Sequence, residues 1–212
     1  TTANLNLDRG VQNMKFITTL LIAFLGFMST AQSASPTATV KQATNSVIVE
    51  LKQMPVAERN SVEVQRLVTN YILPAIDQQK IAKLALGKHW KKASKGQKIA
   101  FIETFRDLQI RTYTGAFKAF DGQEFDFKDA KFNKSGKKAI VKGHMIQPSG
   151  QRIPIDFKLY VNKQQEWKIY DAVIAGLGMV KTYRHQLSEQ LQRKSLDEII
   201  TGMRGQIQTA QR

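Results

Sequence analysis

The chain has 212 residues and a formal net charge of +15, from 32 Lys and Arg against 17 Asp and Glu. A field of this sign favours anionic partners, among which lipid surfaces rank above nucleic acid for an exported protein, although the charge alone could simply keep the protein soluble. The absence of cysteine excludes disulfides and thiolate metal ligands.

The amino-terminal segment predicts export. A basic start at Lys15 precedes an almost continuous apolar run over 16–28 and small residues at 29–31. This order is typical of a cleavable secretory signal, which we place at 14–33. The run is shorter than the ~20 residues that span a bilayer, although an uncleaved anchor is the alternative. Residues 1–13 form an upstream extension of unknown role, and the remainder, 34–212, has the length of one domain.

The first half of the mature chain predicts helices. Apolar residues recur at helical spacing over 40–51, 64–72 and 81–85. Pro55, Pro74 and Gly87 follow these three stripes and end them.

A fourth, longer helix begins at a predicted capping box. Ser94 is followed three residues later by Gln97, the spacing at which each side chain can bond the other residue's backbone N–H. Phe101 and Phe105 lie on the apolar face of this helix.

After Gly122 the spacing of the apolar residues changes from the helical period to every second residue. Alternating apolar residues predict four strands joined by short turns, which make an antiparallel meander. The predicted strands cover 125–127, 137–146, 151–161 and 167–173.

Helices return after Gly176. One apolar stripe runs from Val180 to Leu191, and a second capping box, Ser195 with Glu198, opens the last helix. The order of helices, sheet and helices predicts an α+β fold, with a four-stranded antiparallel sheet covered by the N- and C-terminal helices.

The sequence carries no recognisable catalytic motif. His89, His144 and His185 are far apart and lack metal-ligand spacing. The glycines at 176 and 178 follow a strand, but Lys181 occupies the third glycine position of a dinucleotide-binding turn, and the strand belongs to a meander. We therefore expect no metal and no cofactor, and interpret the glycines as a sharp strand-to-helix turn.

Asp171 is the residue for which two roles remain open. Strand periodicity places it on the same buried face as Trp167, Ile169 and Val173. It is either a structural carboxylate that accepts hydrogen bonds from backbone or from Arg184, or a general base. The second role would make the protein a small α+β isomerase or hydrolase that uses Asp171 and His144 in an apolar pocket.

The segment from Trp167 to Leu187 resembles a known family. Its tryptophan-lysine-hydrophobe start, Asp171, Gly176 and the adjoining Tyr183 and Arg184 resemble the soluble periplasmic component of the Mla phospholipid transport system, the MlaC or Ttg2D toluene-tolerance family of Gram-negative bacteria.

Other features of the chain extend this likeness over nearly the whole mature chain. A second matching segment is 81–90, with the sequence IAKLALGKHW. Gly178 departs from the family's serine, and Ala172 stands where valine is usual.

The resemblance implies a non-enzymatic periplasmic carrier, and a shuttle would most simply be monomeric. Its cargo would be a glycerophospholipid whose acyl chains occupy a deep apolar pocket between sheet and helices. Its partners would be an outer-membrane lipoprotein–porin complex and an inner-membrane ABC transporter complex with its substrate-binding hexamer. Such a carrier would maintain outer-membrane lipid asymmetry.

We expect the pocket to approach the upper end of ligand cavities, about 1,000 Å³. For its lining, face periodicity selects Leu84, Phe105, Tyr113, Phe117, Val141, Phe157, Leu159, Ile169, Val173 and Tyr183.

Overall fold

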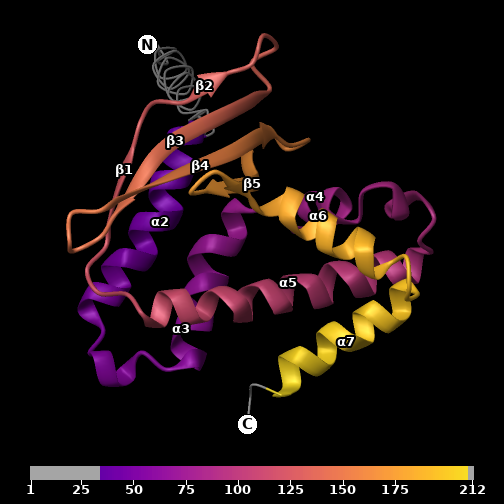
Figure 1. Cartoon of the computed structure of the whole chain (residues 1–212). Helices are drawn as coiled ribbons and strands as arrows, with labels where there is room; N and C mark the ends of the chain where they lie inside the picture. Colours follow the sequence, from indigo (N-terminus) through magenta and orange to yellow (C-terminus); the bar gives the residue numbers. More distant parts are fainter. Residues whose placement is uncertain (1–33, 210–212) are drawn as a thin grey trace, which may run out of the picture. The chain divides into compact units, whose positions relative to one another are not determined.

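An antiparallel sheet lies over a layer of helices (Figure 1). The computed structural model describes residues 34–209, all of which belong to one compact unit. The predicted extension (1–13) and signal sequence (14–33) lie outside the described residues. Within 34–209, no helix is both long and apolar enough to cross a membrane. The predicted α+β class is confirmed.

The helices begin and end close to the predicted positions. The Ser94–Gln97 capping box is present with both of its hydrogen bonds, and Ser195 and Glu198 bond each other's backbone N–H in the same way. The second predicted stripe continues from an α-helix into a π-helical turn, a feature that is frequent at functional sites. The helical elements are α2 (Pro36–Gln53), η1 (Val56–Glu58), α3 (Ser61–Leu67), η2 (Val68–Ile72), η3 (Leu73–Ala75), α4 (Gln78–Leu86), η4 (Gly87–Lys91), α5 (Lys95–Lys118), α6 (Met179–Gln190) and α7 (Leu196–Thr209).

The sheet has six strands, not the four expected. The four predicted strands are present as a meander, and two strands of two residues each were too short to produce a pattern. The strand order is β1-β3-β4-β5-β6, with β2 beside β1 on the same edge of β3. The strands are β1 (Glu124–Phe127), β2 (Lys131–Phe132), β3 (Lys138–Ile146), β4 (Arg152–Val161), β5 (Trp167–Ile174) and β6 (Leu177–Gly178).

A β-bulge in β5 changes which of its side chains face inward. Leu159 pairs with Ile169, but Lys158 pairs with Asp171, so Tyr170 is an extra residue. Beyond the bulge the alternation is shifted by one. Ala172 is therefore opposite the inward-facing Phe157, and the prediction that Val173 shares the face of Ile169 is wrong. Asp171 is buried, as predicted.

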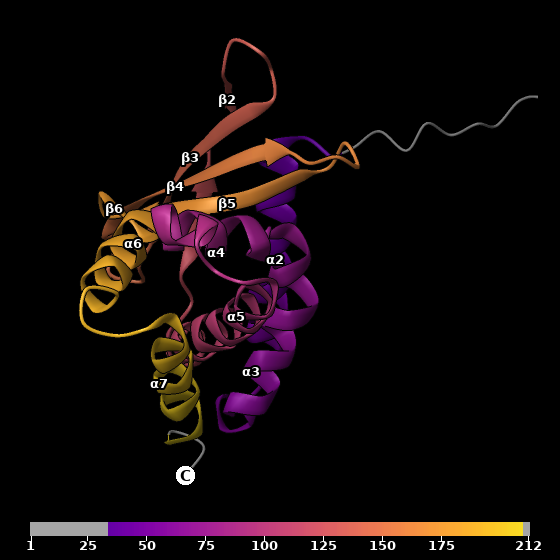
Figure 2. The same ribbon diagram turned by 90° about the vertical axis from the view of Figure 1, so that its right-hand side faces the viewer.

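The core is divided into three clusters. One joins α4, α5, α6 and α7 around Phe101 and Phe105. The second lies under the sheet, where Val40 of α2 packs against Val141 and Leu159. The third joins α2, α3 and the end of α5 around Leu51, Leu67 and Phe120. Figure 2 shows the helices of these clusters gathered below the sheet.

Three arginines fasten helix ends to their neighbours. Arg59 donates to the carbonyls of Leu51 and Phe120, at 2.9 and 2.8 Å, near the ends of α2 and α5. Arg111 of α5 donates to the carbonyl of Ile207 in α7, and Arg184 of α6 to that of Leu84 in α4 at 2.7 Å. A cation is favoured at these sites because the last carbonyls of a helix lack partners and carry partial negative charge.

Gly143 allows β1 to lie close against β3. A Cβ at this position would lie 2.5 Å from Cδ1 of Phe127 and would also overlap the carbonyl oxygen of Asp126. We predict that Gly143→Ala lowers the free energy of unfolding by about 2 kcal/mol, the range of overpacking, in urea denaturation.

Gly115 provides the matched control. It lies inside α5 with no atom within 4 Å of where its Cβ would be. Gly115→Ala should raise the free energy of unfolding by roughly 0.5–1 kcal/mol, since Ala is the better helix former. Effects of the same sign for the two variants would contradict the close approach at Gly143.

Candidate functional site

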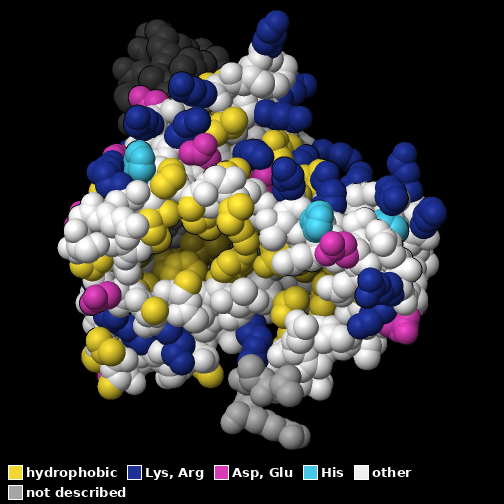
Figure 3. Space-filling model, in the orientation of Figure 1, with side chains coloured by type: hydrophobic (Ala, Val, Ile, Leu, Met, Phe, Trp, Pro, Cys, Tyr) yellow, Lys and Arg dark blue, Asp and Glu magenta, His cyan; other side chains and the backbone are white. Residues whose placement is uncertain are grey.

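A cavity of about 510 Å³ lies between the sheet and the helices. Figure 3 shows it as a hollow lined by hydrophobic side chains, below the sheet and above α5. Its volume is about half of that expected, but it is within the range of roughly 300–1,000 Å³ for small-molecule sites.

The strands supply one wall of the cavity. Alternate inward positions of β4 and, beyond the bulge, of β5 line it, as the period of two requires. The residues of this wall are Gln123, Phe125, Met145, Gln147, Ile153, Ile155, Phe157, Ile169, Asp171, Ala172 and Ile174.

The helices supply the other wall. The π-helical turn η2 contributes Val68 and Ile72, which a regular α-helix would place differently. The residues of this wall are Val40, Ala43, Thr44, Ile48, Val68, Ile72, Leu73, Ile76, Gln78, Ile81, Gln109, Ile110, Tyr113, Ala116, Phe117, Ala119, Phe120, Met179, Val180 and Tyr183.

Few polar groups line the cavity. The hydroxyls of Tyr113 and Tyr183 lie 3.2 Å apart, and burial, followed by this hydrogen bond, raises the pKa of Tyr113, which keeps it neutral. Gln123 donates to Gln147 at 3.1 Å. The side-chain oxygen of Gln109 has no hydrogen-bond partner in the described part of the chain, so it can accept one from a ligand.

The lining contains no Lys, Arg or His among the described residues, and its one carboxylate is neutralised by a partner. Asp171 is 8% exposed, and its carboxylate lies 2.8 Å from Nζ of Lys158 and accepts the backbone N–H of Val180 at 3.0 Å. Asp171 thereby fixes the start of α6 against β5. Of its predicted structural partners, backbone N–H is found, whereas Arg184 bonds Leu84 instead.

Asp171 and His144 are not brought together. They lie on β5 and β3, on opposite sides of β4, opposite Lys158 and Pro154 respectively. Strand spacing places them about 16 Å apart. His144 contacts Arg152 at 3.3 Å on the other face of the sheet. The geometry required by the isomerase or hydrolase hypothesis is therefore absent in residues 34–209, which also hold no group of three or more acidic or His side chains placed to bind a metal.

Five of the ten predicted lining residues line the cavity: Tyr113, Phe117, Phe157, Ile169 and Tyr183.

The other five do not line it, and the reasons differ. Phe105 is 1% exposed and stacks on Phe101, and Leu84 packs against the same helical cluster. Val141 and Leu159 are covered by α2, and the bulge turns Val173 away.

Sequence reasoning missed most of the helical wall. The sequence predicts amphipathic helices at the α2 and η2 positions of this wall, but an apolar stripe does not show whether that face of the helix contacts protein or a cavity. On β4, Ile153 and Ile155 share the face of Phe157, so the same alternation could have found them.

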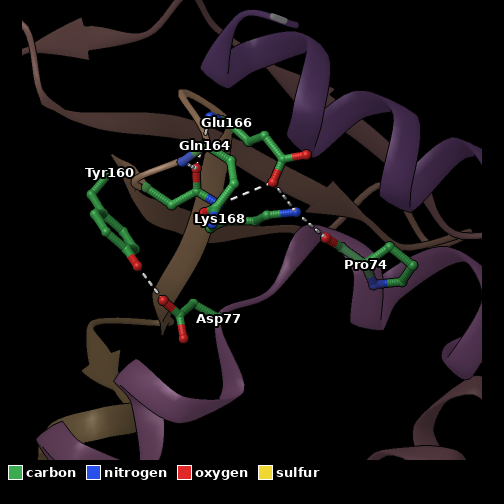
Figure 4. A network of polar contacts seen from close by, with 7 residues as sticks. Pro74, Asp77, Tyr160, Gln164, Glu166 and Lys168 are labelled. Carbon is green, nitrogen blue, oxygen red and sulfur yellow. Dashed lines mark hydrogen bonds and ion pairs between the residues drawn. The ribbon is translucent and has the colours of Figure 1, made fainter.

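A polar network fixes the edge of the site where η3 and α4 meet the sheet (Figure 4). Tyr160 donates to the carboxylate of Asp77, the N-cap of α4. Lys168 of β5 donates to the carbonyl of Pro74 at 2.8 Å and pairs with Glu166 at 3.1 Å. These contacts hold the helical wall against β4 and β5.

The comparisons with known proteins agree with one another. The family model described as "MlaC protein" matches residues 41–205. An intermembrane phospholipid transport system binding protein, MlaC, of Haemophilus influenzae is 25% identical over 190 residues, 88% of this chain and 89% of that protein. Toluene tolerance protein ttg2D of Pseudomonas putida is 26% identical over 196 residues, 90% of each.

A solved structure shows the same fold with a ligand. It is a phospholipid-binding protein from Ralstonia solanacearum in complex with a phospholipid. It is 25% identical to this chain, the match covers 84% of this chain and 100% of that one, and the TM-score is 0.76.

The network at Asp77 predicts a dependence of stability on alkaline pH. Burial, and then the hydrogen bond to Asp77, raises the pKa of Tyr160 to about 12, above the ~10 of an unfolded chain. The neutral phenol therefore stabilises the fold below pH ~10, and this contribution is lost as pH rises through about 12. We expect the difference in unfolding free energy between wild type and Tyr160→Phe to shrink across that window.

Tyr170→Phe is the control, because the Tyr170 hydroxyl has no carboxylate partner among the described residues while its ring packs on Tyr160. A wild-type–Tyr160→Phe difference that does not vary with alkaline pH would contradict the proposed hydrogen bond.

Proposed function

Because the chain belongs to the MlaC protein family, we propose that it is a periplasmic, non-enzymatic carrier of glycerophospholipid. The observation that carries this proposal is the cavity of about 510 Å³, whose walls are almost entirely apolar. A cavity of this kind suits acyl chains, since no cation, histidine or unpaired carboxylate among its described lining residues would be left desolvated beside them.

The physical need for a carrier follows from the cargo. Each CH₂ group exposed to water costs ~0.8 kcal/mol, so two chains of about fifteen carbons would cost on the order of 20 kcal/mol. Enclosing the chains removes this barrier to crossing an aqueous gap.

The volume constrains how the cargo is held. Two full chains would require α2 and α5 to move away from the sheet, or part of the lipid to remain outside the described cavity. The headgroup would stay in water, because the lining offers no charged partner for a phosphate among residues 34–209.

The carrier would work between two membranes. We infer that it exchanges lipid with an outer-membrane lipoprotein–porin complex and with an inner-membrane ABC transporter complex and its substrate-binding hexamer, and so maintains outer-membrane lipid asymmetry. The name of the Haemophilus relative, an intermembrane phospholipid transport system binding protein, supports this place in transport. The predicted signal at 14–33 would direct export, and a shuttle is simplest as a monomer.

Native mass spectrometry tests the cargo directly. We expect the protein purified from a bacterial periplasm without detergent to carry a mass increment of one phospholipid, which denaturation releases for identification. A lipid-free, folded protein that also takes up no phospholipid from vesicles would disprove the carrier proposal.

Adjacent residues of β5 provide a matched pair of blocking variants. Ala172 lines the cavity opposite Phe157, whereas Val173 is turned away by the bulge. We predict that Ala172→Phe loses most of its bound phospholipid, measured per protein after detergent-free purification, because the ring occupies the acyl-chain volume. Val173→Phe should keep its lipid. Equal lipid content in the two variants would show that this cavity is not where the cargo lies.

A further inference from the structure

The hairpin between β2 and β3 concentrates positive charge. Residues 131–138, here called the basic hairpin, hold Lys131, Lys134, Lys137 and Lys138 and no acidic residue. All eight residues are exposed, and none of the four lysines forms an ion pair within the described part of the chain. By contrast Lys142, Lys158 and Lys168, further along the sheet, each have an acidic partner. The charge of the hairpin is therefore uncompensated.

The same hairpin exposes an aromatic ring. Phe132 is 57% exposed and is the one aromatic residue among the large hydrophobic side chains that are exposed in residues 34–209. Its ring makes an edge contact with Trp167 at 5.7 Å, which fixes its direction. An exposed ring beside lysines suits the boundary between headgroups and acyl chains, where lysines extend their charge to the headgroups.

The backbone of the hairpin is pre-formed. The side chain of Asn133 accepts the N–H of Lys138 at 2.9 Å, and its backbone N–H donates to the carbonyl of Lys138 at the same distance. Gly136, with φ of +68°, closes the turn. Docking would therefore cost little backbone ordering.

The shape of the hairpin favours a bilayer over a folded protein partner. Figures 1 and 2 both show it projecting beyond the rest of the sheet as a finger. A stable protein interface needs about 800 Å² from each side. A single finger offers far less, whereas a fluid bilayer can admit one ring and surround it with anionic headgroups.

We propose that the basic hairpin docks the protein on the surface of an anionic phospholipid bilayer, with Phe132 at the interface and the four lysines among the headgroups.

This docking is separate from cargo binding. None of residues 131–138 lines the cavity. The lining residue of β4 nearest to the hairpin, Phe157, pairs with Val141, three residues along β3 from Lys138, or ~10 Å at the rise of a strand. Removal of the hairpin charges should therefore leave the bound lipid unchanged.

The test is co-sedimentation of the mature protein with sucrose-loaded vesicles. One set contains phosphatidylglycerol and phosphatidylcholine in equal parts, and the other phosphatidylcholine alone. Lipid that the protein merely extracts stays in the supernatant, so the pellet reports docking. We expect wild type to pellet with the anionic vesicles and not with the neutral ones.

Variants of the lysines assign the docking to the hairpin. Each lysine near an anionic leaflet contributes about fivefold to partitioning, so the triple change Lys131→Gln, Lys134→Gln and Lys137→Gln should weaken it on the order of one hundredfold. The control removes the same charge at Lys88, Lys91 and Lys92, which are exposed in and beside η4. The control should lose no more than about threefold, the effect of net charge alone.

The aromatic contribution is tested in the same assay. Phe132→Ser should weaken partitioning about tenfold, and Phe132→Trp should restore it. The control is Val56→Ser, since Val56 is 76% exposed in η1 and outside the hairpin. Circular dichroism confirms that each variant is folded.

The outcomes separate this proposal from the carrier function. Wild type that stays in the supernatant of anionic vesicles, or equal losses in the two lysine triples, overturns membrane docking by the hairpin and favours an acidic protein partner. Native mass spectrometry of the same samples reports the cargo, so docking can fail while lipid remains bound, and the reverse is equally visible.

Discussion

The structure depends on holding the sheet and the helices apart, so that an apolar cavity remains between them. Side chains that face a cavity lose the dispersion contacts that a filled core would supply. The fold compensates by dividing its core into three clusters around the cavity, each of which closes one junction between elements. Arg59, Arg111 and Arg184 reinforce the helical junctions through carbonyls that a helix end leaves unpaired. The packing contacts that stabilise the fold therefore lie around the cavity and not within it.

In the sheet, the bulge at Tyr170 determines which side chains of β5 face the cavity. Without it, simple alternation would continue from Ile169 to Asp171 and Val173 on the inward face. With it, Asp171 reaches Lys158 and the N–H of Val180, while Ala172 takes the inward position. One extra residue therefore brings Ala172 into the wall, while Asp171, which also lines the cavity, is paired and anchors the start of α6, which carries Tyr183 into the cavity.

Sequence reasoning succeeded where a local interaction decides the structure. The capping boxes at Ser94 and Ser195 depend on residues three apart, and the four longer strands on simple alternation. It failed where contacts between elements far apart in the sequence determine the structure. Phe105 and Phe117 have the same residue type and helix, yet one is packed in a cluster and the other faces the cavity. The sequence does not predict the bulge, because a period-two pattern is extended along the strand as long as no residue interrupts it. Tyr170 is an ordinary strand residue and gives no such interruption.

The alternation of β3 separates a basic outer face of the sheet from an apolar inner face. Ala139 and Val141 point inward to the core beneath the sheet, while Lys138 and Lys142 point outward. Figure 3 shows the resulting division, with basic side chains gathered over the sheet and hydrophobic ones in the hollow below it. The sheet is one layer thick, so its basic outer face and its largely apolar inner face are separated by a single backbone. This separation allows the outer face to vary in charge without altering the inner wall, because a change of side chain at an outward position leaves the register intact.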